Sequence, residues 1–178
     1  RCFCSIRVYY KWNKECSVYM KINIITVGKI KENYIKTGMN NYIKRMERFC
    51  DVNIYEVKSE KAKDNMTGAQ IEKVKEKESQ RVYDKVPQND YVIALSVKGK
   101  PMTSEGLAKS IQNLQVQGHS SISFLVGGPL GLSDEILEKA DYSLSLSHMT
   151  FTHQMIRLIL IEQLYRAFKI MNGEPYHK

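Results

Sequence analysis

The stretch ISFLVGGPLGLSDE, residues 122–135, joins an apolar run to a glycine-rich turn and then to the start of a helix. Residues 122–126 have the composition of a buried strand, and the Ser-Asp-Glu at 133–135 favours the first turn of a helix. A glycine turn between a strand and a helix often holds a phosphate or a nucleotide. The glycines at 127, 128 and 131 do not match G-x-G-x-x-G, however, so the turn by itself indicates only a tight connection.

Strand and helix patterns alternate along the chain on either side of this turn. Apolar residues recur at helical spacing in the helix candidates, and short apolar or alternating runs stand between them. This order predicts one α/β domain with a mostly parallel sheet and helices on both of its faces. The predicted strands are 21–27, 52–57, 91–97, 122–126 and 142–146; the predicted helices are about 32–49, 69–86, 103–114, 133–140 and 153–171; and KGKPM, 98–102, is predicted as a loop.

Composition and charge narrow the functional classes. The 178 residues are 43% hydrophobic and 26% charged, which suits one globular domain with a sizeable core. A net charge of +8 favours an anionic partner, nucleic acid first, although many proteins are mildly basic. The longest apolar run, MIRLILI at 155–161, is too short to cross a bilayer and contains Arg157, so we expect no membrane partner.

Residues 1–19, RCFCSIRVYYKWNKECSVY, differ in composition from the rest of the chain. They hold three of the four cysteines and the only tryptophan, and they show no clear period. Met20 then opens MKINIITVGK, which has the pattern of a natural start followed by a strand. We therefore expect a non-native or disordered extension over 1–19 and a single domain over 20–178. Cys50, at an apolar position of a predicted helix, has no partners with disulfide or zinc spacing, so we expect no metal and a reducing cytoplasm.

Three predicted strand ends carry the residues best suited to a ligand, because ligands of parallel sheets bind beyond the carboxyl ends of strands. The segments are LSVKGKPM from Leu95, VGGPLGL from Val126 and SLSHMTFTHQM from Ser145. The third segment mixes small hydroxyls with Met149 and Phe151, a combination that suits an adenine ring and a ribose. No cluster of cations for a pyrophosphate accompanies them. A nucleoside with a sulfonium tail therefore fits these loops better than a nucleoside triphosphate.

From Met20 to Lys178 the sequence resembles the RlmH family of SPOUT methyltransferases. Five ordered motifs carry the resemblance: MKINIITVGKIKE from residue 20, LSVKGKPMTSEGLA from 95, FLVGGPLGL from 124, SLSHMTFTHQMIRLILIEQLYRAFKI from 145 and GEPYHK from 173. The resemblance implies an enzyme that uses S-adenosylmethionine to methylate N3 of a pseudouridine in large-subunit ribosomal RNA. It also implies a homodimer and a C-terminal trefoil knot, which sequence periodicity cannot indicate.

The same resemblance implies which residues contact the cofactor. They belong to the three strand ends named above: Leu95, Gly127, Leu146, Ser147, His148, Met149, Thr150 and Phe151. Thr152 departs from the family pattern, because many members carry proline before the His-Gln pair. The third of these loops is therefore expected to be less rigid at that position.

Methylation of an imide nitrogen needs a proton acceptor or hydrogen-bonding cations beside the acceptor base, because the nitrogen attacks well only as its proton leaves. His177 is the candidate acceptor, Tyr176 is a candidate to stack on the base, and Arg157 is a candidate to face the RNA or stabilise the developing charge. The plainer alternatives are a frayed terminus for Tyr176 and His177, and a helix-surface arginine paired with a carboxylate for Arg157. His153 is interpreted as a structural histidine.

The helix at 153–171 gives an independent argument for a homodimer. It is apolar nearly all round, so it must be buried on more than one side. We expect its own sheet to cover one side and a second subunit to cover the other. The alternative is a central helix in the core of a monomer. Without an RNA-binding module of its own, such an enzyme is expected to recognise a preassembled shape. The family resemblance implies that this shape is the ribosome rather than free RNA. Candidates for phosphate contacts are Lys29, Lys31, Lys44, Arg45, Arg48, Lys98 and Lys100.

Two other functions compete with this interpretation. One is a SPOUT enzyme with a different acceptor, such as a ribose 2′-hydroxyl in transfer RNA. The other is a non-catalytic α/β binding module of flavodoxin-like shape. Such modules place an acidic or phosphate-binding site early in the chain, and the first turn here, VGKIKE, carries neither.

Overall fold

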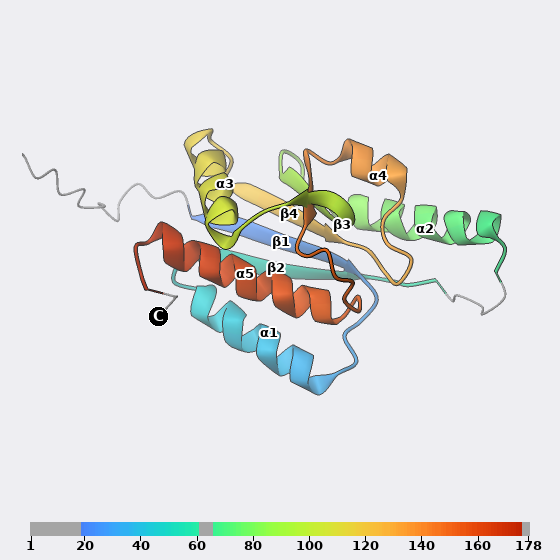
Figure 1. Cartoon of the computed structure of the whole chain (residues 1–178), viewed down its shortest axis with the longest axis horizontal. Coiled ribbons are helices and arrows are strands. Elements are labelled where there is room, and N and C mark those ends of the chain that lie inside the picture. Colours follow the sequence, from blue (N-terminus) through green and yellow to red (C-terminus); the bar gives the residue numbers. More distant parts are fainter. Residues whose placement is uncertain (1–18, 61–65, 176–178) are drawn as a thin grey trace, which may run out of the picture.

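A computed structural model describes residues 19–60 and 66–175 of the chain (Figure 1). Nearly all of the expected extension over 1–19 lies outside these residues, and so do Tyr176 and His177. Strands and helices alternate throughout the described part. The strands are β1 (Met20–Val27), β2 (Cys50–Val57), β3 (Tyr91–Pro101), β4 (Ser121–Val126) and β5 (Tyr142–Ser145), and the helices are α1 (Asn33–Met46), α2 (Gly68–Tyr83), α3 (Ser104–Val116), α4 (Asp134–Lys139) and α5 (Met155–Met171).

The strands form one sheet in the order β2-β1-β4-β3-β5. Every neighbouring pair is parallel, so all the carboxyl ends lie at the same edge of the sheet. β1 and β4, in the middle, are buried along almost their whole length, as expected of strands covered on both faces. The predicted α/β class with a parallel sheet is confirmed.

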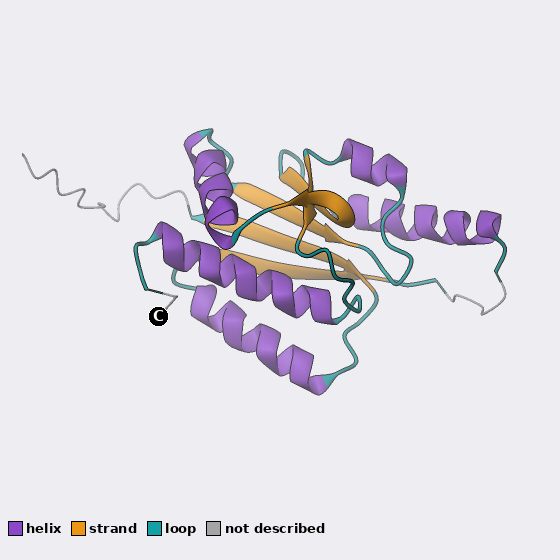
Figure 2. Ribbon diagram, in the orientation of Figure 1, coloured by secondary structure: helices purple, strands orange, loops and turns teal. Residues whose placement is uncertain are grey.

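Helices cover both faces of the sheet (Figure 2). Because side chains alternate along a strand, Ile22 and Ile24 of β1 point to one face, where they join the core formed with α1, α3 and α5. Ile25 and Val27 point to the other face, where α2, α4 and the residues before α4 cover them. Both layers are needed to bury a sheet with this many apolar residues on its two sides.

A buried polar network joins the amino ends of the central strands, opposite the edge that holds the carboxyl ends. The Asn23 amide Nδ2 donates to Asp90 Oδ2 at 2.8 Å, and Ser123 Oγ donates to the same oxygen at 2.6 Å. Asn23 and Ser123 are almost fully buried. The network satisfies polar groups that would otherwise destabilise the core between β1 and β4.

Two local expectations are wrong. The predicted loop over 98–102 is largely strand: after a register shift beyond Leu95, β3 continues until Lys100 and Pro101 pair with β5. Gly99 makes this pairing possible, because a Cβ there would lie 2.6 Å from the carbonyl carbon of Leu144. Cys50 begins β2 rather than lying in a helix, since α1 ends at Met46. It is a buried core residue as expected, and burial raises the pKa of its thiol to about 12.

No helix in the described parts of the chain combines the length and the apolar character needed to cross a bilayer.

Candidate cofactor-binding site

The carboxyl ends of β3, β4 and β5 border a pocket of about 880 Å³. Its volume falls in the range that holds small ligands and cofactors, about 300–1,000 Å³. All three predicted segments contribute to its lining. Of the eight residues that the family resemblance implies, Leu95, Gly127, Leu146, Ser147, Met149, Thr150 and Phe151 line the pocket, and His148 does not.

The two ends of the glycine turn, at Gly127 and Gly131, lie too close together to leave room for a Cβ on Gly127. A Cβ on Gly127 would lie 2.5 Å from the carbonyl carbon of Gly131, and Gly131 itself has a φ of +80°. The turn is closed by a hydrogen bond of 3.0 Å from Gly131 N to Gly128 O. It is therefore a tight connection, and the same glycines leave bare backbone along the pocket wall.

We call residues 146–154, which connect β5 to α5, the third loop. Short polar contacts define its course: Ser145 Oγ donates to Ser147 O at 3.0 Å, and Met149 N donates to Ser147 Oγ at 2.9 Å. Thr152, where the family often has proline, accepts a hydrogen bond of 3.2 Å from Met155 N and so supports the start of α5. Met149 is 73% exposed at the rim of the pocket.

A loop near the start of the described chain, which we call the first loop, also reaches the pocket. It comprises residues 28–32 and connects β1 to α1. Glu32 and, in the first turn of α1, Tyr34 are among the lining residues, although neither was predicted there. Their place at this edge depends on β1 lying beside β4, and strand order cannot be read from sequence pattern.

Charges of both signs surround the pocket. Glu32 and Asp134 contribute carboxylates, while Lys75 and Lys98 contribute ammonium groups. A triphosphate would need several clustered cations or several free helix N-terminal amides. A lining with two carboxylates and two ammonium groups does not provide such a cluster. Carboxylates beside apolar walls suit a ligand that carries a positive charge of its own.

Arg157, at the start of α5, lies directly behind the third and first loops. It is fully buried. Its Nε donates to the His153 carbonyl at 3.0 Å, Nη1 donates to the Gly28 carbonyl at 2.9 Å, and Nη2 donates to the Val27 carbonyl. This position differs from the expected helix surface, because the guanidinium is turned into the protein.

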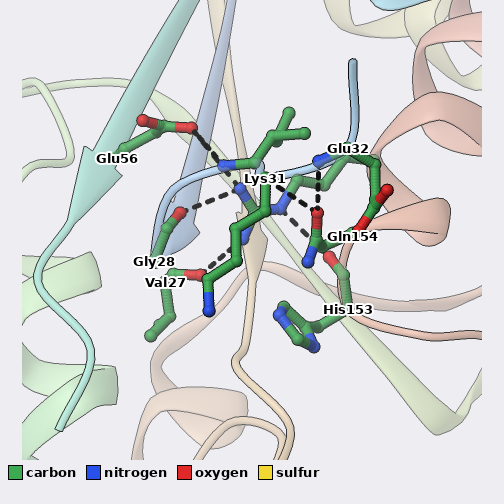
Figure 3. Close-up of polar contacts among 9 residues, drawn as sticks. Val27, Gly28, Lys31, Glu32, Glu56, His153 and Gln154 are labelled. Carbon is green, nitrogen blue, oxygen red and sulfur yellow. Dashed lines mark hydrogen bonds and ion pairs between the residues drawn. The ribbon is translucent and has the colours of Figure 1, made fainter. Parts of the chain in front are cut away.

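Two neighbours extend the contacts made by Arg157 (Figure 3). The Glu56 carboxylate lies 3.7 Å from Arg157 Nη1, and its Oε1 accepts a hydrogen bond of 3.1 Å from Ile30 N. Gln154 Oε1 accepts a hydrogen bond of 3.0 Å from Lys31 N. Side chains from the end of β2 and the start of α5 therefore hold the backbone of the first loop.

His153 lines the pocket and is half-buried. Burial lowers the pKa of its imidazole, and the nearby positive charges of Arg157 and Lys31 lower it further. The ring is therefore neutral at pH 7. Its backbone carbonyl accepts a hydrogen bond from Arg157, a contact that any residue at this position could make, and the interpretation of the side chain as structural stays a prediction.

The described chain ends far from this pocket. α5 runs back from the carboxyl edge of the sheet to the opposite edge (Figure 1). There the Glu174 carboxylate pairs with Arg48 and with Lys169. Glu174 therefore fixes the end of the described chain at the edge of the sheet opposite the pocket.

The sequence of the chain is similar to those of known proteins. A family described as predicted SPOUT methyltransferases matches residues 20–177. The chain belongs to this SPOUT methyltransferase family. A protein of Halothermothrix orenii named Ribosomal RNA large subunit methyltransferase H is 66% identical over 159 residues, which are 89% of this chain and 100% of that protein. Proteins of the same name from Clostridioides difficile and Enterococcus faecalis are 52% and 45% identical, with the same coverage. The resemblance drawn from the sequence is confirmed.

A SPOUT methyltransferase implies S-adenosylmethionine as the methyl donor, and the residues of the pocket fit that molecule. Gly127 and Gly128 line the pocket, and a Cβ on either would meet the chain itself, at Gly131 or at Glu78, so glycine keeps the turn on its tight course along the pocket wall. Leu95 and Leu146 supply apolar walls for a planar base. The carboxylates of the lining suit the positive sulfonium. Among residues 19–60 and 66–175, no group of three or more His, Cys, Asp or Glu side chains is placed to hold a metal ion.

Proposed function

We propose that this SPOUT methyltransferase transfers a methyl group from S-adenosylmethionine to N3 of a pseudouridine in large-subunit ribosomal RNA. The observation that carries the proposal is the 66% identity, over its full length, to a protein named Ribosomal RNA large subunit methyltransferase H. The pocket at the carboxyl edge supports the donor part of the reaction. The net charge of +8 supports a nucleic-acid acceptor.

When bound, S-adenosylmethionine would supply an electrophilic methyl group on a sulfonium sulfur, which would leave with the electron pair of the carbon–sulfur bond. The chain's own residues hold donor and acceptor in line, which is a large part of the rate enhancement in such displacements. The three strand-end segments with Leu95, Gly127 and 146–151 are proposed to bind the donor. His177 is proposed to take the proton from N3, and Tyr176 to stack on the base.

The proposed catalytic tail comes from a second copy of the chain. α5 has 17 residues, so its ends lie about 25 Å apart. Glu174 holds the tail beside Lys169, whereas the pocket lies at the opposite end of the helix, beside Gln154 and Ile156. A stretch of three residues spans only about 10 Å, which supports a tail that serves the pocket of the partner subunit.

The surface of α5 supports the same homodimer. Met155, Ile156, Leu158 and Ile159 are only half-buried within the single chain. Together with the exposed Met149 they form apolar surface next to the pocket, and a partner subunit would remove it from water. The C-terminal trefoil knot and a cytoplasmic location remain predictions from the family resemblance and from cysteine usage.

Arg157 is not proposed to contact RNA. Its guanidinium donors are directed at backbone carbonyls inside the domain, which supports a role behind the pocket. The exposed lysines at 29, 31, 98 and 100 and the basic residues of α1 are better candidates for phosphate contacts. The absence of an RNA module in the described chain supports recognition of the shape of assembled ribosomes.

A methyl-transfer assay tests the proposed function. Labelled S-adenosylmethionine is supplied with ribosomes from cells that lack the modification, with free ribosomal RNA and with transfer RNA, and product nucleosides are identified by mass spectrometry. We expect methylpseudouridine, formed on ribosomes and not on free RNA. A ribose-methylated nucleoside from transfer RNA would instead favour the other SPOUT acceptor class. Failure to bind S-adenosylmethionine would revive the non-catalytic binding module.

A further inference from the structure

The buried guanidinium of Arg157 is used entirely for holding backbone. Its Nε, Nη1 and Nη2 each donate to a different carbonyl, on His153, Gly28 and Val27. His153 belongs to the third loop, whereas Val27 ends β1 and Gly28 begins the first loop. One side chain therefore joins two segments that are more than a hundred residues apart in sequence. Lysine, with a single nitrogen at its tip, cannot reproduce this planar fork.

Burial of the Arg157 guanidinium costs free energy, and the need to fill space in the core does not explain why a cation occupies this position. An arginine with no exposed surface loses its hydration, and burial accordingly lowers its pKa. Its carboxylate neighbour Glu56 stands 3.7 Å away and is partly exposed, so the ion pair offsets only part of that loss. An apolar residue of similar length would fill the same space without the penalty. The three carbonyl contacts are what distinguish arginine here.

Gln154 repeats this connection through another backbone group, and Glu56 of β2 holds the first loop from a second side. Gln154, the last residue of the third loop, accepts from Lys31 N at 3.0 Å. Glu56 accepts from Ile30 N at 3.1 Å while it faces Arg157. Figure 3 shows these side chains converging on the first loop from two sides. The loop is thus held at residues 28, 30 and 31.

Both segments joined in this way are walls of the pocket. The first loop ends in Glu32, and the third loop ends in His153 and Gln154; all three residues line the cavity. A change in the distance between the two loops changes the width of the pocket at that side. Polar partners behind a binding site commonly fix the residues that touch the ligand.

From these contacts we infer that Arg157 is a positioning residue which, with Gln154 and Glu56, locks the third loop to the first loop and sets the shape of the cofactor pocket. We call these three residues the loop latch. Arg157 and Glu56 do not line the pocket, so they act on the ligand only through the loops, whereas Gln154 also lines it beside His153. Loss of Arg157 therefore weakens cofactor binding more than it slows the chemical step. The inference rests on the proposed function, because it takes S-adenosylmethionine as the ligand of the pocket.

The test measures S-adenosylmethionine binding by isothermal titration calorimetry, together with KM for the cofactor and kcat on ribosomes. Arg157→Met removes the three donors, and Arg157→Lys keeps the charge with one donor group. We expect the Kd of Arg157→Met to rise about tenfold or more, as for loss of charge-assisted hydrogen bonds. We expect the Kd of Arg157→Lys to fall between that of Arg157→Met and that of the wild type. In both variants KM should change by a larger factor than kcat at saturating cofactor.

A milder pair keeps the inference testable if Arg157→Met does not fold. Gln154→Ala removes the acceptor for Lys31 N at a half-buried position, and Gln154→Glu keeps an acceptor oxygen there. We expect Gln154→Ala to weaken cofactor binding several-fold and Gln154→Glu to restore most of it. Asn23→Ala is the matched control, because it breaks a buried polar network at the opposite edge of the sheet. It should lower Tm without changing the cofactor Kd.

The outcomes separate the two claims. Wild-type protein that does not bind S-adenosylmethionine would overturn the proposed function and the latch with it. Wild-type binding that is matched within about twofold by folded Arg157 and Gln154 variants would overturn the latch alone, since that difference is under half a kcal/mol. An equal loss of affinity in Asn23→Ala would also overturn it, because the effect would then follow from general destabilisation.

Discussion

Gly127 carries the tightest steric constraint in the pocket. Gly127→Ala would place a Cβ 2.5 Å from the carbonyl carbon of Gly131, so the turn must open. Opening a packed turn costs about 1–3 kcal/mol, and the displaced backbone is the pocket wall itself. We expect Gly127→Ala to weaken S-adenosylmethionine binding at least tenfold, as measured by calorimetry. Gly68→Ala is the control, because a Cβ there meets nothing within 4 Å. Equal affinities of the two variants would contradict the proposed role of the turn as a pocket wall.

His153 gives the domain a predictable response to acid. Burial and neighbouring cations hold its folded pKa below the usual value of 6.5, so below that pH the unfolded chain binds more protons than the folded one. Its contribution to stability is therefore present above about pH 6.5 and is lost as pH falls through the folded pKa. We expect wild type to lose more free energy of unfolding between pH 7.5 and pH 5 than His153→Gln does, measured by urea titration. Equal losses in the two proteins would show that the imidazole has the same pKa in the folded and in the unfolded chain.

Sequence pattern located most of the pocket but not what supports it. Leu95, Gly127 and the residues after Leu146 could be predicted, because they follow strands whose carboxyl ends meet in any parallel sheet. Arg157 was predicted either to face the RNA or the developing charge, or to pair with a carboxylate at the helix surface, since one arginine in an apolar helix gives no sign of which way its side chain turns. Its acceptors are backbone carbonyls of the β1 end, and a carbonyl has no sequence signature.

At the scale of elements, α2 begins with a complete capping box, which the sequence alone could have indicated. Thr67 Oγ1 accepts from Gln70 N, and Gln70 Oε1 accepts from Thr67 N at 2.9 Å. Thr67→Ala should lower the free energy of unfolding by about 1 kcal/mol, because the first helical amides lose their acceptor. Thr67→Ser keeps the hydroxyl and should lose little. Chemical denaturation measures both, and unchanged stability in Thr67→Ala would show that the cap contributes nothing.

The order of helices and strands was predictable from periodicity, whereas pairing between strands was not. The core strands β1 and β4 read as continuous apolar runs, and they appear with nearly the predicted bounds. β3 was expected to end at Val97, because lysine, glycine and proline follow. It continues because β5 offers backbone partners across a register shift, and Gly99 lets the two strands approach. That contact joins residues far apart in the chain, so no local pattern records it.

The whole molecule places its two proposed functional parts at opposite ends. The proposed cofactor pocket lies at the carboxyl edge of the sheet, and Glu174, next to the end of the described chain, pairs with Arg48 at the other end of α5. A dimer in which each tail serves the partner's pocket resolves this separation. It also predicts a solution mass of about twice 20.6 kDa, which light scattering would measure.

Mixed dimers provide the decisive form of this prediction. His177→Ala keeps a sound pocket with a defective tail, and Gly127→Ala keeps a sound tail with a defective pocket. His177→Ala alone is expected to be nearly inactive, since loss of a general base costs about 10²–10⁴ in rate. Gly127→Ala alone is expected to be strongly impaired when S-adenosylmethionine is supplied well below the raised Kd of this variant. After the two are unfolded together and refolded, half of the dimers are mixed, and each mixed dimer has one sound pocket beside one sound tail. If tails act on the partner, activity returns to about a quarter of the wild-type value per chain. If each tail acts on its own subunit, no chain in the mixture has both parts, and activity stays at the level of the single variants.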